Sequence, residues 1–168
     1  MTINILLRST KASDLDLVLS AEQHPDNCNF VYQWDYQTHF NALTDDNFRH
    51  YVITNPEHKF LGYVILDNVK DSSNSINLRR LVVTRKGESI GKQTVRLIQK
   101  LAFEELNAHR LWLDVFVDNQ RAYNLYKQVG FREEGKLIES YLRNNQYASQ
   151  YIMAILKHEY EILSELMG

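Results

Sequence analysis

The sequence predicts one α+β domain built around a mixed β-sheet, and three observations support this prediction. The chain has 168 residues, a length that suits a single domain spanning residues 1–168. Strand-like and helix-like segments follow one another in the order β-α-α-β-β-β-α-β-α-β-β, with one strand–helix–strand crossover at the centre. The chain holds only 6 Gly and 2 Pro, so we expect most of it to form regular secondary structure.

The first third of the chain predicts one strand and two helices. Residues 3–8 are typical of an opening strand. Ser13 is predicted to cap a helix that runs to about Gln23, because Asp14 and Asp16 would then lie in its first turn, where carboxylates suit the helix dipole. A second, shorter helix is predicted over residues 36–43.

The middle of the chain predicts three strands and a helix. Segments 51–54 and 60–66 are separated by a short turn, which is typical of an antiparallel hairpin, and a further strand is predicted over residues 76–84. The next helix begins near Ile90 and has one apolar stripe and one polar face. The stripe consists of Val95, Ile98, Leu101, Ala102 and Leu106, and the polar face of Lys92, Arg96, Gln99 and Lys100.

The last third begins with the clearest strand of the chain, residues 111–117. Asn119 is predicted to cap the following helix, and Gly130 is predicted to end it as a C-cap glycine. The remaining segments are strands at about 131–142 and 147–156 and a tail helix at 158–167.

Charge is distributed unevenly along the chain. The net charge is -2 and the pI about 6.3, whereas a general nucleic-acid binder is usually basic, so we expect no nucleic-acid partner. Residues 79–100 hold seven Lys/Arg against Glu88 alone, and residues 1–50 hold three Lys/Arg against seven Asp/Glu. One region therefore suits a polyanion and the other a cation, although solvated surface explains both equally well.

Other classes of protein are excluded by simple counts. The single cysteine, Cys28, allows no intrachain disulfide, and nothing around it indicates a nucleophile. No apolar run approaches the ~18 residues of a membrane helix, and the N-terminus does not fit a signal peptide, so we expect a cytoplasmic protein without a membrane partner. The six His show no metal-ligand spacing, so we expect no metal.

A glycine-bearing turn stands between the strand at 76–84 and the helix that follows it. Such a turn presents free backbone N–H groups and a helix N-terminus, which favour phosphate, although a plain turn also needs small residues. Three residues separate its glycines and Gln93 follows its last lysine, so it is not a P-loop. No early strand is followed by a dinucleotide fingerprint. The turn consists of Lys86, Gly87, Glu88, Ser89, Ile90, Gly91 and Lys92.

Three segments in series resemble the GNAT acetyltransferase superfamily, and within it the branch of ribosomal-protein-alanine and polyamine acetyltransferases. They are Leu81, Val82 and Val83 leading into the turn at 86–91, the strand and cap at 111–122, and residues 123–131 with their Y-x-x-x-G-F ending. Two positions depart from the family pattern: Lys86 stands where Gln or Arg is usual, and Ser89 where the family has Gly. Asn77 lies near where some relatives place a glutamate.

The resemblance implies an acyl-CoA N-acyltransferase fold and transfer of an acetyl group from acetyl-CoA to a primary amine. It implies about seven mostly antiparallel strands with helices on both faces, and a central parallel pair, 76–84 and 111–117, that splays apart. The turn would bind the pyrophosphate. The edge formed by Leu81, Val82 and Val83 would pair with the pantetheine arm and stabilise the oxyanion. Asn119 and Ala122 would complete the cofactor site.

Tyr126 is the expected general acid, because its motif position would set it beside the departing thiolate. A phenol of pKa ~10 can hydrogen-bond a thiolate whose thiol has a pKa of ~8.5 without being ionised at pH 7. Core packing is the alternative, since Tyr126 also lies on the apolar stripe of its helix. The general base stays open between Glu22, Asp114 and a chain of waters.

The acceptor stays open between a protein N-terminus, a polyamine, an aminoglycoside and an amino acid. Deprotonation at pH 7 costs about 1 kcal/mol for an α-amine and about 4.6 kcal/mol for a lysine-like amine, so an enzyme without a dedicated base favours the first. Phe30 and Trp34 are candidates to line the acceptor pocket, or else pack the first helices on the sheet. A non-catalytic acyl-CoA-sensing domain is the alternative function, and the oligomeric state is a monomer or a homodimer.

Overall fold

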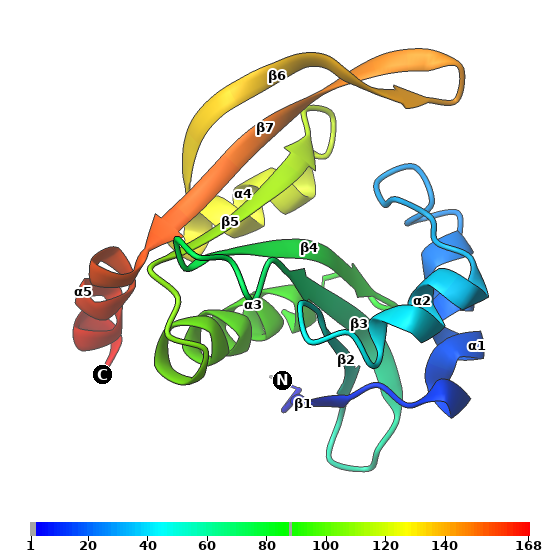
Figure 1. Ribbon diagram of the computed structural model, residues 1–168, viewed down its shortest axis with the longest axis horizontal. Helices are drawn as coiled ribbons and strands as arrows, with labels where there is room; N and C mark the ends of the chain where they lie inside the picture. Colours follow the sequence, from blue (N-terminus) through cyan, green and yellow to red (C-terminus); the bar gives the residue numbers. More distant parts are fainter. Residues whose placement is uncertain (1–2, 88) are drawn as a thin grey trace.

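A computed structural model describes residues 3–87 and 89–168, so the predicted cofactor contact of Glu88 lies outside the described residues. Seven strands form one mixed sheet in the order β1-β2-β3-β4-β5-β7-β6 (Figure 1). The strands are β1 (Leu6–Ser9), β2 (Arg49–Thr54), β3 (Phe60–Asp67), β4 (Ser75–Val83), β5 (Arg110–Phe116), β6 (Arg132–Arg143) and β7 (Gln146–Leu156). The α-helices are α1 (Leu15–Gln23), α2 (Tyr36–Ala42), α3 (Ile90–Lys100), α4 (Gln120–Gln128) and α5 (Lys157–Met167). The predicted order of elements is confirmed.

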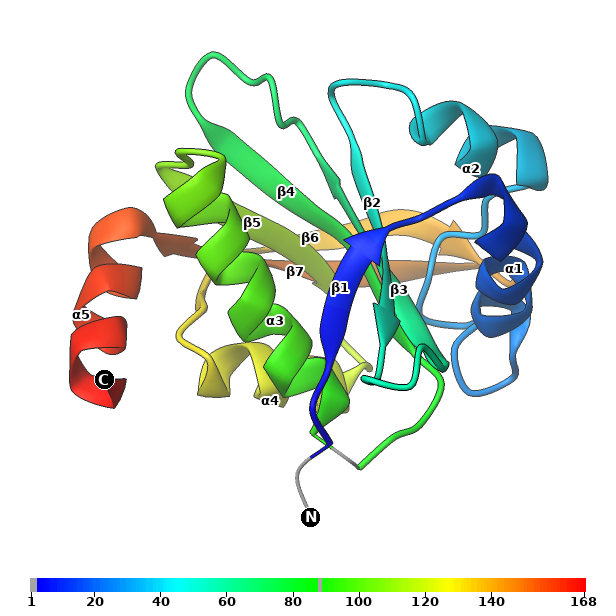
Figure 2. The same ribbon diagram turned by 90° about the horizontal axis from the view of Figure 1, so that it is seen from below.

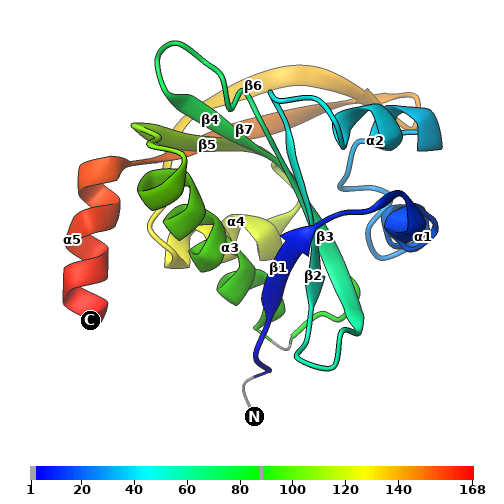
Figure 3. The ribbon, with the colours of Figure 1, turned by 60° about the horizontal axis from the view of Figure 1, so that its bottom comes forward.

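Helices cover both faces of the sheet. Figures 2 and 3 show α3 and α4 on one side and α1 and α2 on the other. The central strand β3 is buried on both faces, and its side chains alternate between two apolar clusters. Val64 and Leu66 pack toward α3 and α4, whereas Tyr63 and Ile65 pack with residues of α1. Within the described residues, no helix is long and apolar enough to cross a membrane.

The parallel pair β4–β5 separates soon after it forms. Its pairing covers Ser75↔Arg110, Ile76↔Leu111 and Asn77↔Trp112, and no later pair joins the two strands among the described residues. On its other side β4 stays paired with β3, with a register shift that leaves Arg79 as an extra residue. Strand β5 meanwhile pairs with β7 over its whole length. The predicted splay is confirmed.

The start of α1 differs from the prediction, which placed Ser13 at the N-cap. A 3-10 turn, Ala12–Asp14, comes first, and α1 begins only at Leu15. The Asp14 carboxylate accepts a hydrogen bond from the Lys11 backbone N–H and pairs with Arg8 at 2.8 Å. The hydrogen bond from Arg8 is the main reason that the pKa of Asp14 lies below its usual value. A tertiary ion pair therefore sets this helix start.

The predicted polar face of α3 is wrong at Gln99. Its side chain is 4% exposed, and its Nε2 donates to the carbonyl oxygen of Val129 at 2.8 Å. Gln99 thus ties α3 to the end of α4, where Gly130 takes a left-handed backbone (φ 100°) as predicted for a C-cap glycine. Beyond Lys100 the helix continues as a π-type turn, Leu101–Glu105.

Gly62 is expected to be indispensable to the β3–β4 pairing. Its φ is 151°, and an added Cβ would lie 2.1 Å from the Val82 carbonyl oxygen. Gly62→Ala should therefore lower the free energy of unfolding by about 2 kcal/mol or more, measured by urea titration. Gly135→Ala is the matched control, because nothing lies within 4 Å of its added Cβ. Equal losses in the two variants would contradict this account.

Candidate active site

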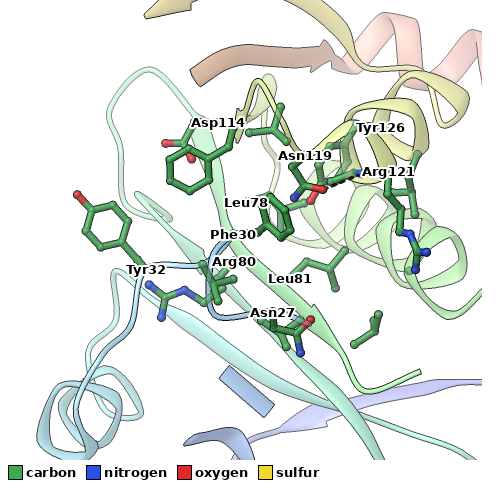
Figure 4. Close-up of a pocket in the computed structure, with 18 of the residues that line it drawn as sticks. Asn27, Phe30, Tyr32, Leu78, Arg80, Leu81, Asp114, Asn119, Arg121 and Tyr126 are labelled. Carbon is green, nitrogen blue, oxygen red and sulfur yellow. Dashed lines mark hydrogen bonds between the residues drawn. The ribbon is translucent and has the colours of Figure 1, made fainter. Parts of the chain in front are cut away.

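A cavity of about 850 Å³ lies where β4 and β5 part (Figure 4). Its size falls in the range of small-molecule and cofactor sites. One wall is β4 from Asn77 to Val83, and the facing wall comes from β5 and the start of α4. The loop after α1 contributes a third wall through Asn27, Phe30 and Tyr32. The splay of the parallel pair therefore opens a site that three distant segments complete.

The β4 wall is a strand edge without a strand partner. Leu81, Val82 and Val83 line the cavity as the sequence predicts. Their backbone groups on the side of β5 are not used in the ladder, because pairing with β5 stops at Asn77. An extended chain carrying amide groups fits such an edge as an additional strand would.

The glycine-bearing turn closes one end of this cavity. Lys86 and Gly91 line it, and the Lys86 Nζ donates to the Asn27 Oδ1 at 2.6 Å and to the Val83 carbonyl oxygen at 3.2 Å. Burial lowers the pKa of Lys86, and the positive charge of Arg121 adds to this shift. Lys86 thus joins the loop after α1 to the end of β4, a contact that the sequence did not indicate.

The other predicted residues of the turn contribute through the backbone or through packing. Gly87 has a φ of 80°, and Ser89 lies in the left-handed region at φ 61° and ψ 10°. Ile90 is buried in a cluster with residues of β2 and β3. Gly91 allows α3 and α4 to approach, because a Cβ there would lie 3.0 Å from the Leu125 Cδ1. Lys92 follows in the first turn of α3, outside the cavity lining.

Helix α4 presents three predicted residues to the cavity. Asn119 caps the helix, since its Oδ1 accepts a hydrogen bond from the Ala122 N–H at 3.3 Å, and both residues line the cavity. Tyr126 lines the cavity while its ring packs edge-on against Phe131. Burial raises the pKa of Tyr126, and the charge of Asp114 raises it further. The phenol is therefore a neutral hydrogen-bond donor at every physiological pH.

Arg121 was missed by the sequence analysis. It lies in the first turn of α4 and lines the cavity on the same side as Lys86 and the glycine-bearing turn. Its position directly after the capping residues was the available signal, because a basic side chain at a helix N-terminus, close to a turn with free backbone N–H groups, favours an anion. The turn end of the cavity is thus basic.

The aromatic candidates separate in the structure. Phe30 and Tyr32 line the cavity, and Figure 4 shows Tyr32 on the side opposite Arg121, but Trp34 lies outside the lining. The Trp34 ring instead packs over the Arg80 guanidinium at 4.9 Å and against His39 at 5.2 Å. Trp34 therefore packs behind Arg80 and does not line the cavity.

Beside Tyr32, the loop after α1 contacts the β6–β7 hairpin. Tyr32 packs edge-on against Tyr141, with ring centroids 4.4 Å apart. The Arg143 guanidinium donates to the Asn29 carbonyl oxygen at 3.0 Å and pairs with Asp118 at 2.6 Å. The contacts of Tyr32 with Tyr141 and of Asn29 with Arg143 hold together segments more than 100 residues apart in the sequence.

The two carboxylates considered for the general base lie in contrasting surroundings. Glu22 is fully buried and accepts hydrogen bonds from the Tyr63 hydroxyl at 2.7 Å and from the Arg80 Nη1 at 2.8 Å. His39 contacts the same carboxylate at Oε1 and the Trp34 N–H donates to Oε2, and Glu22 is not among the described residues that line the cavity. Asp114 lines the cavity, has no direct hydrogen bond or ion pair among the described residues, and has a pKa raised by burial.

The sequence matches the family model of the acetyltransferase (GNAT) family over residues 15–131, so the chain belongs to that family. It is 24% identical to spermidine N(1)-acetyltransferase of Vibrio cholerae, covering 98% of this chain and 100% of the relative. It is 26% identical to a putative ribosomal protein bS18-alanine N-acetyltransferase of Bacillus subtilis, covering 88% and 89% of the two chains.

The solved structures agree with this assignment. A crystal structure of spermidine N-acetyltransferase from Vibrio cholerae in complex with CoA and spermine superposes with a TM-score of 0.85 at 22% identity, covering 94% of this chain and 98% of that one. The predicted family, fold and reaction class are confirmed: the protein is an N-acetyltransferase that transfers the acetyl group of acetyl-CoA to an amine. No cluster of His, Cys, Asp or Glu suited to a metal ion occurs among residues 3–87 and 89–168.

Ser89 is expected to hold the turn in a strained conformation. A non-glycine residue in the left-handed region costs roughly 1–2 kcal/mol, whereas glycine adopts it freely. Ser89→Gly should therefore raise the free energy of unfolding by about 0.5–1 kcal/mol, after the greater entropy of glycine in the unfolded chain is counted. Ser89→Ala is the matched control and should show no such gain in urea titrations. A destabilised Ser89→Gly variant would show that the serine side chain holds the turn.

Proposed function

We propose that the acetyl transfer takes place in the cavity between β4 and β5, by direct attack of the amine in a ternary complex, with Asp114 as general base and Tyr126 as general acid. One observation carries the proposal. The partnerless edge of β4, the phenol of Tyr126 and the carboxylate of Asp114 all line the same cavity. The arrangement supplies a binding edge, a proton donor and a proton acceptor.

The two ends of the cavity have different tasks in this proposal. At the turn end, the N–H groups at the start of α3, together with Lys86 and Arg121, bind the phosphates of acetyl-CoA. The edge of Leu81, Val82 and Val83 pairs with the amide groups of the pantetheine arm, and the Asn119 side chain hydrogen-bonds to that arm while it caps α4. The amine enters from the opposite end, beside Phe30 and Tyr32.

The chemical step then needs proton transfers at both the nitrogen and the sulfur. Asp114 takes a proton from the ammonium form of the acceptor, which leaves a nucleophilic lone pair on nitrogen. The nitrogen adds to the acetyl carbon, and a backbone N–H near Val82 or Val83 stabilises the oxyanion of the tetrahedral intermediate. As the carbon–sulfur bond breaks, Tyr126 donates its hydrogen to the departing sulfur. The nitrogen then loses its second proton, which restores the Tyr126 phenol, and the proton held by Asp114 returns to solvent.

The alternative, an acyl-CoA-sensing domain without catalysis, needs the cofactor end of the cavity only. It gives no role to the Asp114 carboxylate, which lines the cavity and has no ion pair among the described residues. It also gives no role to the contacts that Arg143 makes with Asp118 and the loop after α1. The same proposal treats residues 1–168 as one catalytic domain. The enzyme acts in the cytoplasm on a small-molecule or peptide amine, without nucleic acid or a membrane, as a monomer or a homodimer.

Tyr126→Phe is expected to lower kcat by roughly 100-fold or more, the usual effect of losing a general acid. The ring still packs against Phe131, so the free energy of unfolding and the dissociation constant of acetyl-CoA should stay near their wild-type values. Thiol release measures kcat, and calorimetry measures acetyl-CoA binding. Tyr160→Phe on α5 is the matched control with unchanged turnover. A fully active Tyr126→Phe enzyme would remove the residue from the mechanism.

Asp114→Asn is expected to lower kcat/KM at neutral pH by roughly 100-fold. In the wild type, kcat/KM should fall with decreasing pH along a limb that lies above the ordinary range of an aspartate, because burial raises the pKa of Asp114. The variant should lack this limb.

The thermal stability of Asp114→Asn provides the control for this prediction. A raised pKa in the folded state means that the protonated carboxyl favours folding, and this stabilisation is lost as the pH rises through the folded pKa. Asp114→Asn should therefore be at least as stable as the wild type at pH 7 in thermal unfolding. A destabilised variant with an unchanged pH profile would contradict the role of base.

A further inference from the structure

We propose that the acceptor is an amine whose neighbouring carbon carries a C=O or carboxylate oxygen, as in an α-amino acid or a peptide N-terminus, and that Arg80 and Asn77 recognise it. This inference rests on the function proposed above and names the class of its acceptor. It depends on three groups at the end of the cavity where the amine enters, here called the acceptor end. They are the Arg80 guanidinium, the Asn77 amide oxygen and the Asp114 carboxylate.

The acidic residues of the N-terminal region do not supply unpaired carboxylates to the acceptor end of the cavity. Asp14 pairs with Arg8, Asp35 caps α2, and Glu22 is enclosed by its own hydrogen-bond donors. Asp26 lines the cavity, but near Lys86 at the turn end. Among the described residues, Asp114 is the carboxylate left without an ion pair at the acceptor end. A polyamine with several positive charges needs several such groups.

Arg80 presents half of its guanidinium group without a partner. The residue is 3% exposed and lines the cavity, and Figure 4 shows its guanidinium on the same side as Tyr32. Its Nη1 donates to Glu22, whereas its Nη2 is buried and has no hydrogen-bond partner among the described residues. A buried N–H without a partner is costly, and an oxygen of the acceptor placed there removes that cost.

Asn77 offers the complementary group. The residue is 7% exposed, lines the cavity, and has a buried Oδ1 to which no group in residues 3–87 and 89–168 donates a hydrogen bond. It is the last residue of β4 that pairs with β5, opposite Trp112, and Asp114 follows two residues later on the same face of β5. An amine N–H donates to the Asn77 Oδ1, and the Asp114 carboxylate lies on the same side to take the proton.

The guanidinium is held in place by a buried network. Glu22 accepts from the Arg80 Nη1, the Tyr63 hydroxyl and the His39 Nε2. His39 in turn contacts His50 at 3.0 Å, and His50 contacts the Thr10 hydroxyl at 2.7 Å. Burial lowers the pKa of His50 to about 3, so this ring is neutral, and the chain of hydrogen bonds ends on the Glu22 carboxylate. Arg80 therefore cannot turn away from the cavity without breaking the network.

A polyamine does not satisfy these groups. Its nitrogen atoms donate hydrogen bonds and carry positive charge, so it would leave the Arg80 Nη2 without a partner and place a second cation beside it. An amine next to a C=O group supplies the missing acceptor. For a peptide N-terminus, a pKa of ~7.8 against ~10.4 for an alkyl amine also fits a single carboxylate as base.

Matched triplets of acceptors test the inference. Each triplet consists of an amino acid, its amide and its decarboxylated amine, which share one side chain, and spermidine is added as the polyamine. Initial rates of thiol release are compared per neutral amine, so that differences in amine pKa cancel. We expect the amino acid or the amide to react at least ~10-fold faster than the decarboxylated amine. A preference for the acid identifies a free amino acid, and equal or faster reaction of the amide identifies a peptide N-terminus.

Arg80→Lys then tests the residue. The lysine keeps a positive charge beside Glu22 but has one nitrogen in place of the two at the end of the guanidinium. It therefore cannot donate to Glu22 and also reach the acceptor oxygen in the fixed geometry of Arg80, so the preference over the decarboxylated amine should disappear while the KM for acetyl-CoA stays unchanged. Arg96→Lys on the exposed face of α3 is the matched control. A purely structural role would lower the rates with all three members of a triplet equally, and that result overturns the assignment.

Two further outcomes separate this inference from the proposed function. Decarboxylated amines or spermidine reacting as fast as the oxygen-bearing acceptors would overturn the acceptor class and leave the acetyl transfer standing. No turnover with any amine, despite binding of acetyl-CoA in calorimetry, would overturn both.

Discussion

The structure depends on the short pairing between β4 and β5. Three residue pairs hold the strands parallel at one end, after which β4 follows β3 and β5 follows β7. Two strands that diverge leave backbone groups unpaired, and such groups are stable only where solvent or a ligand reaches them. The cavity is the direct consequence of this divergence. Gly62 contributes from behind, because its missing Cβ lets β3 approach the Val82 carbonyl group.

The bulge at Arg79 divides β4 into two parts, whose buried side chains pack on opposite faces of the sheet. Before it, Ile76 and Leu78 pack into the core beneath α3, and after it Arg80 and Val82 face α1. The buried pair of Arg80 with Glu22 adds little to stability by itself, because desolvation offsets most of its Coulomb energy. Its effect is to fix one donor of the guanidinium and leave the other at the cavity wall. The hydrogen-bond network from Glu22 to Thr10 therefore fixes the position of the Arg80 Nη2.

The two ends of the cavity differ in how they are built. The turn end uses backbone N–H groups, glycines and cations near the start of two helices, all within about 40 residues of sequence. The acceptor end draws on the loop after α1, on β4 and β5, and on the β6–β7 hairpin, which Arg143 ties to Asn29. Local sequence motifs encode the first, and long-range packing encodes the second. This division explains how one family fold accepts one cosubstrate and different amines.

The sequence by itself determined the elements and the turn end of the cavity. Apolar spacing, Asn119 as a cap, Gly130 as a C-cap and the turn at 86–92 act over four or five residues, through backbone dihedrals and neighbouring hydrogen bonds, and these are visible in the chain. Only the tertiary structure decided which carboxylate is free. Glu22 and Asp114 were equivalent candidates in the sequence, but Tyr63 and Arg80, 41 and 58 residues away, enclose Glu22. Trp34 and Gln99 were likewise placed by distant partners, Arg80 and Val129. Burial and pairing are properties of the packed interior, and no local pattern specifies them.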